Sequence, residues 1–296
     1  MKTLKLLSIV LIMSACSETE DSNTFDLQGH RGCRGLYPEN TIPAFLHAID
    51  LGVTTLEMDL AVTKDGQLVV SHEPYMSAEI CLDSAGNEIS DSLQYQYNMY
   101  EMTFQEVSAF DCGSKPHPRF PKQSNIKTIK PLLEEVIRTV KSYPDKNKVF
   151  NIYYNIEIKS QPKYDGIYHP APAEFSELVY KAVSRNLDWS YVTIQSFDFR
   201  VLQYFHEHYP EVTLAQLIEN KNSLDQNLED LGFKPDIYSC DFTLLSRESV
   251  QHLQELEIKV IPWTVNEKGD MKRLINWGVD GLITDYPNRY NELSDE

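Results

Sequence analysis

Two histidines near the start of the 296-residue chain each end a predicted strand, and both could take part in proton transfer. They are His30 and His72. Cleavage of a phosphodiester needs one group to activate the nucleophile and another to protonate the leaving alkoxide, and histidine can do either near neutral pH. We therefore predict that they form an acid/base pair. Arg31 and Lys159 would hold phosphate oxygens, the arginine through two parallel hydrogen bonds and the lysine as a point charge.

Three carboxylates recur on two predicted strands. Glu57 and Asp59 lie two residues apart, so they point to one face of their strand, and Glu157 repeats this pattern on the strand expected over 150–158. Two close carboxylates repel each other and are costly to bury unless a cation lies between them. The three residues offer only hard oxygen ligands, which suit Mg²⁺ or Ca²⁺ rather than zinc.

Strands and helices must position these residues, and they alternate along most of the chain. Such alternation favours a parallel sheet with helices outside, and the length of the chain favours an α/β fold of the (β/α)8 TIM-barrel type over residues 25–296. A doubly wound open sheet is the alternative, but no strand is followed by Gly-x-Gly-x-x-Gly. Strands are expected over 25–30, 53–62, 67–72, 150–158, 192–196, 212–217, 236–239, 259–264 and 281–284, and helices over 40–51, 103–110, 131–142, 173–185, 199–208, 247–257 and 268–277.

The stretch over about 74–130 loses this regular period. A structureless loop of that length is improbable in a compact barrel, so we predict an inserted subdomain after the second strand region, over the mouth of the barrel. Cys81 and Cys112 both fall in it; a disulfide between them and free thiols are both open. Cys33 is expected to be a small buried thiol, and His117 a surface residue of a proline-rich piece.

Residues 1–15 have the layout of a secretory signal peptide, with a basic start, an apolar run and small residues at the end. Because Cys16 follows directly, the segment resembles a bacterial lipoprotein signal, with Cys16 as the lipidated N-terminus; a plain signal peptide is the alternative. Residues 16–24 would form a polar tether. We expect an extracytoplasmic protein that is held to a bacterial membrane by its lipid anchor alone, because no second apolar run is long enough to span a bilayer.

The chain is strongly acidic, with 27 basic and 44 acidic residues and a net charge of −17. Without residues 1–15, which hold two lysines and no acid, 25 basic residues remain and the net charge is −19. There is no basic stripe, so we do not expect nucleic acid as a partner. A small phosphate substrate would have to be received by a bound cation or by a few placed Arg and Lys side chains.

In order and spacing, these residues resemble the glycerophosphodiester phosphodiesterase family over about 28–288. The resemblance implies a (β/α)8 barrel that hydrolyses glycerophosphodiesters to glycerol 3-phosphate and an alcohol. It also implies that His30 and His72 are the acid/base pair, that Arg31 and Lys159 contact phosphate, and that the three carboxylates bind one divalent cation. It rests on His30-Arg31-Gly32, Glu39-Asn40-Thr41, Glu57-x-Asp59, Asp65-Gly66, His72, Glu157-x-Lys159, Gln195-Ser196-Phe197, Trp263-Thr264-Val265-Asn266 and Asp280-Gly281-Leu282-Ile283-Thr284-Asp285-Tyr286-Pro287.

Two features depart from the family pattern. Glu73 stands where the family has aspartate, and the insertion matches no pattern, so we expect it to shape the pocket for the alcohol. Trp263 would line an apolar part of the mouth or belong to the core. The rival functions are a phosphoinositide phospholipase C-like barrel, which would release a phosphorylated headgroup, and a non-catalytic surface binding lipoprotein. The second is disfavoured because all seven candidate residues are present.

Overall fold

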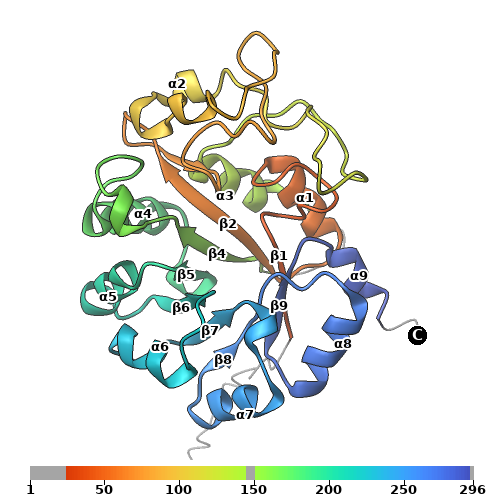
Figure 1. The fold of residues 1–296 in the computed structure, drawn as a ribbon, viewed down its shortest axis with the longest axis vertical. Coiled ribbons are helices and arrows are strands. Elements are labelled where there is room, and N and C mark those ends of the chain that lie inside the picture. The colour runs from red at the N-terminus through yellow and green to blue at the C-terminus, as the bar shows by residue number, and fades with distance from the viewer. Residues whose placement is uncertain (1–24, 145–150, 294–296) are drawn as a thin grey trace, which may run out of the picture.

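The structure is a computed structural model that describes residues 25–144 and 151–293. The predicted signal peptide, Cys16 and the tether lie outside the described residues. Eight parallel strands form a barrel with helices around it, and the insertion lies at one end, at the top of Figure 1. The predicted (β/α)8 fold is confirmed.

Neighbouring strands in the nine-stranded sheet follow the order β8-β7-β6-β5-β4-β2-β1-β9, and β3 pairs antiparallel to β2. The ring closes between β9 and the segment after β8, where Ile283 donates its backbone N–H to Pro262 and accepts one from Val265. The strands are β1 (Asp26–Gly29), β2 (Thr55–Val62), β3 (Leu68–Val70), β4 (Tyr153–Ile158), β5 (Val192–Ser196), β6 (Thr213–Ile218), β7 (Ile237–Cys240), β8 (Lys259–Val260) and β9 (Gly281–Thr284).

The described helices agree with the predicted ones within a few residues, except for α6 and α9, which the sequence pattern did not predict. α6 falls in a stretch read as irregular, although Ser223 caps its start and Gly232, with a φ of 84°, ends it. The strand predicted over 259–264 keeps ladder pairing only in β8. The helices are α1 (Ile42–Asp50), α2 (Phe104–Val107), α3 (Leu133–Ser142), α4 (Pro172–Asn186), α5 (Phe199–His208), α6 (Leu224–Leu231), α7 (Arg247–Glu255), α8 (Lys268–Trp277) and α9 (Pro287–Asn291).

Side chains of β2 alternate between two environments, as a strand period of two requires. Leu56, Met58 and Leu60 are fully buried in the main hydrophobic core between the sheet and the helices. Glu57 and Asp59 point to the other face, the inside of the barrel, where they are also buried. The same alternation on β4 places Glu157 inside the barrel, so two adjacent strands bring three carboxylates together.

The insertion has a hydrophobic core of its own. Met76, Met99, Val107 and Phe110 pack there on the face of the β2–β3 hairpin that points away from the main core, and the disulfide Cys81–Cys112 belongs to the same cluster. The disulfide that the sequence left open is therefore present. Turns, short helical pieces and a disulfide build this subdomain, which explains why its sequence shows no regular period.

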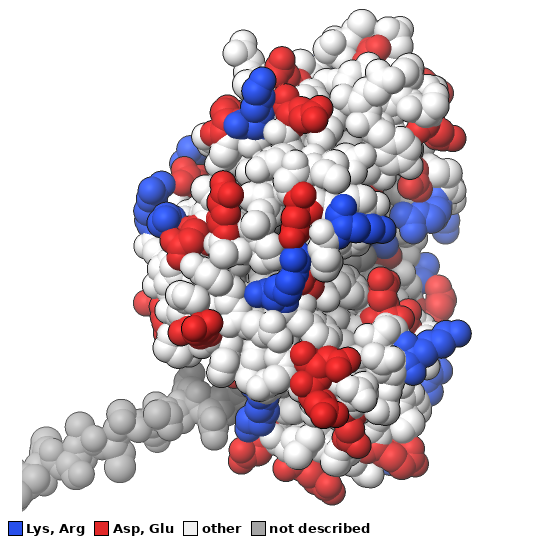
Figure 2. All heavy atoms as spheres, turned by 60° about the vertical axis from the view of Figure 1, so that its left-hand side comes forward, with Lys and Arg blue, Asp and Glu red and all other residues white. Residues whose placement is uncertain are grey.

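The surface carries charges of both signs. On the face in Figure 2, acidic and basic side chains are interspersed, so no single-sign field covers that face. Within the described residues, every helix is too short or too polar to cross a membrane.

Candidate active site

The C-terminal ends of the barrel strands surround a pocket of about 420 Å³. Six of the seven predicted site residues line it, and Asp59 lies directly beneath as part of the carboxylate cluster. The pocket also takes side chains from the insertion, among them Ser77 and Arg119. The structure therefore brings together residues that lie more than 120 positions apart in the sequence.

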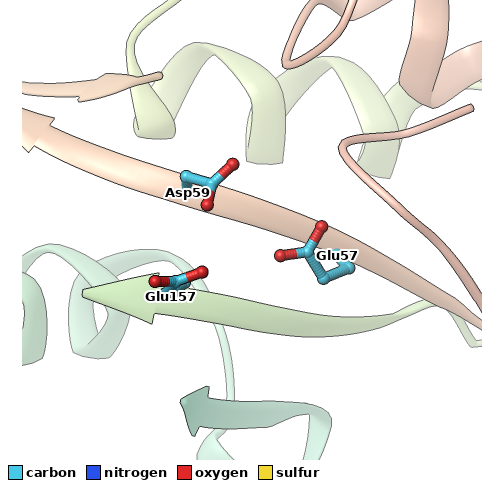
Figure 3. Close-up of side chains that lie close together, drawn as sticks. All are labelled: Glu57, Asp59 and Glu157. Carbon is cyan, nitrogen blue, oxygen red and sulfur yellow. The ribbon is translucent and has the colours of Figure 1, made fainter. Parts of the chain in front are cut away.

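Glu57, Asp59 and Glu157 converge in this pocket, and each offers an oxygen within 4.8 Å of the others. Figure 3 shows that the two side chains from β2 and the one from β4 point into the same space. The two carboxylate oxygens of Glu57 each accept a hydrogen bond, Oε2 from the Arg31 backbone N–H at 2.7 Å and Oε1 from the Gln195 amide at 2.8 Å. Two hydrogen bonds thus fix the orientation of the Glu57 carboxylate.

The electrostatics of the cluster fit a bound cation. Burial, together with the charge of Asp59, raises the pKa of Glu57, and burial raises the pKa of Glu157 to about 7. Burial alone would also raise the pKa of Asp59, but the nearby Arg31 lowers it, so this carboxylate stays ionised. Its Oδ1 atom is buried and accepts no hydrogen bond from the described residues. An ionised carboxylate oxygen that accepts no hydrogen bond, beside two further carboxylates, belongs to the oxygen donor set that Mg²⁺ and Ca²⁺ prefer.

Both predicted phosphate-binding cations lie beside this cluster. Arg31 is fixed by ion pairs with Glu39 at 2.9 Å and with Asp59 at 3.3 Å, and its backbone has a φ of 50°. Lys159 pairs with Glu157 at 2.9 Å and lies 3.8 Å from Asp59. Each cation is held by carboxylates, and each lines the pocket.

His30 is held by a partner from the far end of the chain. Its Nδ1 atom lies 2.7 Å from Asp285, which also accepts hydrogen bonds from Arg34 at 3.0 and 3.2 Å and from Asn266 at 2.8 Å. Burial, followed by the charge of Arg34, lowers the pKa of His30 to about 4. The imidazole is therefore neutral at pH 7. With Nδ1–H donated to the carboxylate, Nε2 carries the free lone pair.

His72 is held in a similar way by its sequence neighbour. Its Nδ1 lies 2.8 Å from Glu73, the residue that replaces the aspartate of the family pattern, and Glu73 in turn hydrogen bonds to Tyr75. The longer side chain still reaches the histidine. Burial, with the charges of Arg31 and Lys159, lowers the pKa of His72.

Sequence reasoning missed Asp285 and Arg34 as site residues. Asp285 follows β9 directly, so the rule that selected His30 at the end of β1 would also have selected it. The contact between Asp285 and His30 joins residues 255 positions apart, and it exists because β1 and β9 are neighbours in the ring.

The prediction that His117 is a surface residue is wrong. The side chain is 3% exposed, packs edge-on against Phe120 and lines the pocket. Its Nδ1 accepts the backbone N–H of Arg119. The proline-rich segment folds back over the mouth, which a local sequence pattern cannot reveal. Cys33, in contrast, is the buried thiol that was expected.

Trp263 lines the pocket, as one of its two predicted placements required. Its indole N–H donates to the Ser239 carbonyl at 3.0 Å, and its ring packs edge-on against Phe197 with centroids 5.5 Å apart. Both rings line the pocket and form an apolar part of its wall.

The barrel and this pocket define the chain as an α/β-barrel hydrolase of phosphoric diesters. A sequence profile of the Glycerophosphoryl diester phosphodiesterase family matches residues 30–289, and the chain belongs to this family.

Named relatives agree with this assignment. The chain is 28% identical over 270 residues to a glycerophosphodiester phosphodiesterase of Bacillus subtilis, and the match covers 89% of this chain and 84% of that protein. It is 27% identical over 281 residues to the lysophospholipase D GDPD1 of Rattus norvegicus, with the same coverage of 89% and 84%. Both matches span most of this chain and of each relative, in agreement with its membership of the family.

Solved structures share the fold. A candidate glycerophosphoryl diester phosphodiesterase from Silicibacter pomeroyi superposes with a TM-score of 0.80 at 29% identity, over 92% of this chain and 94% of that one. An Oleispira antarctica phosphodiesterase in complex with the product sn-glycerol-3-phosphate gives a TM-score of 0.71 at 20% identity, over 92% and 97%.

Proposed function

We propose that this enzyme hydrolyses glycerophosphodiesters to glycerol 3-phosphate and an alcohol by metal-dependent, two-histidine acid/base catalysis. The observation that carries the proposal is the meeting of His30, His72 and the three-carboxylate cluster in one pocket at the C-terminal ends of the strands. The product named for the Oleispira antarctica structure supports glycerol 3-phosphate as the phosphorylated product here.

Glu57, Asp59 and Glu157 would hold one divalent cation, Mg²⁺ or Ca²⁺. The fit rests on the buried Oδ1 of Asp59, which accepts no hydrogen bond from the described residues, and on the purely oxygen donor set. When bound, such a cation supplies Lewis-acid stabilisation of charge on the phosphoryl oxygens.

The chain's own residues perform the proton transfers and bind the phosphate. Arg31 and Lys159 bind phosphate oxygens from the side of the cluster. His30, held neutral with its Nε2 lone pair free, is suited to remove a proton from the nucleophile. His72, which is less enclosed and pairs with Glu73, is suited to protonate the leaving alkoxide.

An assay of the purified protein on a panel of glycerophosphodiesters, with product identification, tests the proposal. EDTA should abolish turnover, and added Mg²⁺ or Ca²⁺ should restore it. Glycerol 3-phosphate among the products excludes a phospholipase C-like reaction, which leaves the phosphate on the headgroup. Turnover that EDTA does not affect would refute the proposed metal dependence. A protein that hydrolyses none of the substrates would refute the proposed enzymatic function.

The location of the enzyme is also a proposal, made from the sequence. We propose that Cys16 is lipidated and that the protein is anchored on the extracytoplasmic side of a bacterial membrane. The Cys81–Cys112 disulfide supports an oxidising compartment. Metabolic labelling with a radioactive fatty acid should label the parent protein and not a Cys16→Ala variant; equal labelling would refute the anchor.

A further inference from the structure

A buried lysine lies close to His72, and the proposed mechanism does not use it. Lys130 directly precedes Pro131, where the insertion returns to the barrel and leads into α3. The lysine is 3% exposed and is not among the residues that line the pocket. Its ammonium donates a hydrogen bond to the Ser71 hydroxyl at 2.8 Å. Within the described residues the ammonium forms no ion pair, and this hydroxyl is its one hydrogen-bond partner.

Such a lysine is unfavourable for the fold. An ammonium can donate three hydrogen bonds, so burial with one partner and no ion pair leaves much of its lost hydration uncompensated. Burial lowers the pKa of this lysine, although the charges of Glu39, Glu73 and Asp59 oppose the shift. An apolar side chain of similar length would occupy the same space more favourably. The packing of the fold therefore does not explain a lysine at position 130.

Ser71 connects the lysine to the turn that carries His72. The Ser71 hydroxyl accepts the hydrogen bond from Lys130 and donates one to the Glu73 carbonyl at 2.6 Å. The backbone N–H of Ser71 donates to the Asp59 carbonyl at 2.9 Å, and the residue is fully buried. The Glu73 carboxylate in turn lies 2.8 Å from Nδ1 of His72. A continuous path of hydrogen bonds thus runs from the buried ammonium to the imidazole.

The backbone that carries the lysine is anchored beside the same turn. The Val70 N–H donates to the Pro131 carbonyl at 2.8 Å, and Val69 forms an antiparallel bridge with Leu132. Val69 and Val70 belong to β3, which ends directly before the turn. Because the backbone beside the lysine is paired with β3, the hydrogen bond from the ammonium holds the turn in one place.

We propose that Lys130 is a positioning residue for His72, because through Ser71 it holds the turn at the place from which the imidazole reaches the leaving oxygen. The inference rests on the proposed function, in which His72 transfers the proton. A displacement of about 1 Å at a catalytic group can lower the rate by about 10²-fold. Loss of the ammonium should therefore slow turnover without destabilising the fold.

Lys130→Met tests this role, because it removes the ammonium and keeps an apolar chain. We expect kcat to fall by about 10–10²-fold, with KM and divalent-cation affinity unchanged. The free energy of unfolding should not fall, because a buried charge without an ion pair has been removed. A purely structural role requires the opposite result, a lower stability with parental kcat in the folded protein. That result would overturn the proposal.

Lys127→Met is the matched control. It makes the same change in charge at an exposed lysine of the insertion, three positions earlier in the chain. This variant should match the parent in kcat, KM and stability. An equal loss of kcat in the control would show that turnover responds to the net charge of the insertion, and it would overturn the positioning role.

Double variants show whether the effect passes through His72. In a His72→Ala background, Lys130→Met should lower kcat by no more than about twofold, whereas in a His30→Ala background it should still lower kcat by about 10-fold or more. Ser71→Ala should slow turnover as Lys130→Met does, and the two changes together should be no slower than the slower single variant. Equal losses in both histidine backgrounds would overturn the proposal.

Hydrogen exchange separates this proposal from the proposed function, because it needs no turnover. The Ser71 amide, followed by NMR, should exchange at least about 10-fold faster in Lys130→Met than in the parent and in Lys127→Met. Faster exchange in a protein that hydrolyses no glycerophosphodiester would show that the lysine holds the turn and would refute only the proposed catalysis. An active enzyme with parental exchange and parental kcat in Lys130→Met would refute the positioning role alone.

Discussion

The inside of the barrel has two halves of opposite character. One buried set of inward side chains is polar and comes from β1, β2, β4 and β5, whereas another is apolar and comes from β6, β7, the segment after β8, and β9. The polar set comprises Gln28, Glu57, Asn155 and Gln195, and the apolar set comprises Ala215, Ile237, Ile261 and Ile283, all of them buried.

The polar half is stable because its members bind one another. The Asn155 amide donates to Gln28 at 2.7 Å and to Gln195 at 2.9 Å, and Gln195 donates to Glu57. A buried polar group without such a partner would be costly. This chain of hydrogen bonds connects Gln28 on β1 to Glu57 in the carboxylate cluster. The polar half therefore orients the site, whereas the apolar half contributes a hydrophobic cluster.

Neutralising a carboxylate in the polar half should have the largest effect. Asp59→Asn keeps the shape and the contact with Asn40 but removes the charge and the buried oxygen that accepts no hydrogen bond. We expect loss of divalent-cation binding in calorimetry and loss of detectable turnover. Ile283→Val, on the apolar half, serves as the control and should bind the cation like the parent. Cation binding by Asp59→Asn at parental affinity would contradict the assignment.

Removing either histidine should be the next largest effect. His30→Ala and His72→Ala should each lower kcat by ~10²–10⁴-fold, because one proton transfer loses its positioned group. Affinity for the cation should be unchanged, because the three carboxylates are its proposed ligands and neither histidine belongs to that set. The pH profiles distinguish their roles: His30→Ala should lose the acidic limb and His72→Ala the basic limb. Parental turnover in both variants would show that the acid/base assignment is wrong.

Asp285 lies where the two halves meet, between β9 and β1, and its effect should be intermediate. Asp285→Asn can no longer fix the tautomer of His30, and we expect kcat to fall by about 10–10²-fold, as when an orienting partner of a functional histidine is removed. KM and cation affinity should change little, which identifies a positioning role. A large rise in KM at unchanged kcat would argue against it.

The buried neutral state of His30 also predicts a pH effect on stability. Its pKa falls from 6.5 to about 4 in the fold, so below pH 6.5 the unfolded chain binds a proton that the folded chain does not. The stability from neutral His30 is complete above pH 6.5 and is lost as the pH falls through 4. Denaturant unfolding between pH 7 and 4 should therefore show a smaller loss for His30→Gln than for the parent. Equal slopes would contradict a depressed pKa.

The two halves also differ in how far the sequence reveals them. Alternation on β2 and β4 is local, so the strand pattern alone assigns Glu57, Asp59 and Glu157 to one face. Asp285 could be placed at a strand end, but its contact with His30 depends on ring closure, which no local pattern contains. The insertion was hardest to predict, because His117 is buried by a segment whose path is set by turns and a disulfide.

A substitution in the apolar half should have the smallest effect on catalysis. It tests whether only the polar half orients the active site. Ile261→Val removes one buried methylene from the wall that includes Ile237 and Ile283, and it should cost about 0.5–1.5 kcal/mol of unfolding free energy. Because no hydrogen bond to the carboxylates passes through this wall in the described residues, kcat/KM and cation affinity should match the parent. The counterpart is Asn155→Leu, which leaves the acceptors of Gln28 and Gln195 unpaired and should lower cation affinity as well as stability. If Ile261→Val weakened cation binding as much as Asn155→Leu, the apolar wall would also orient the site, and the two halves would not be separate.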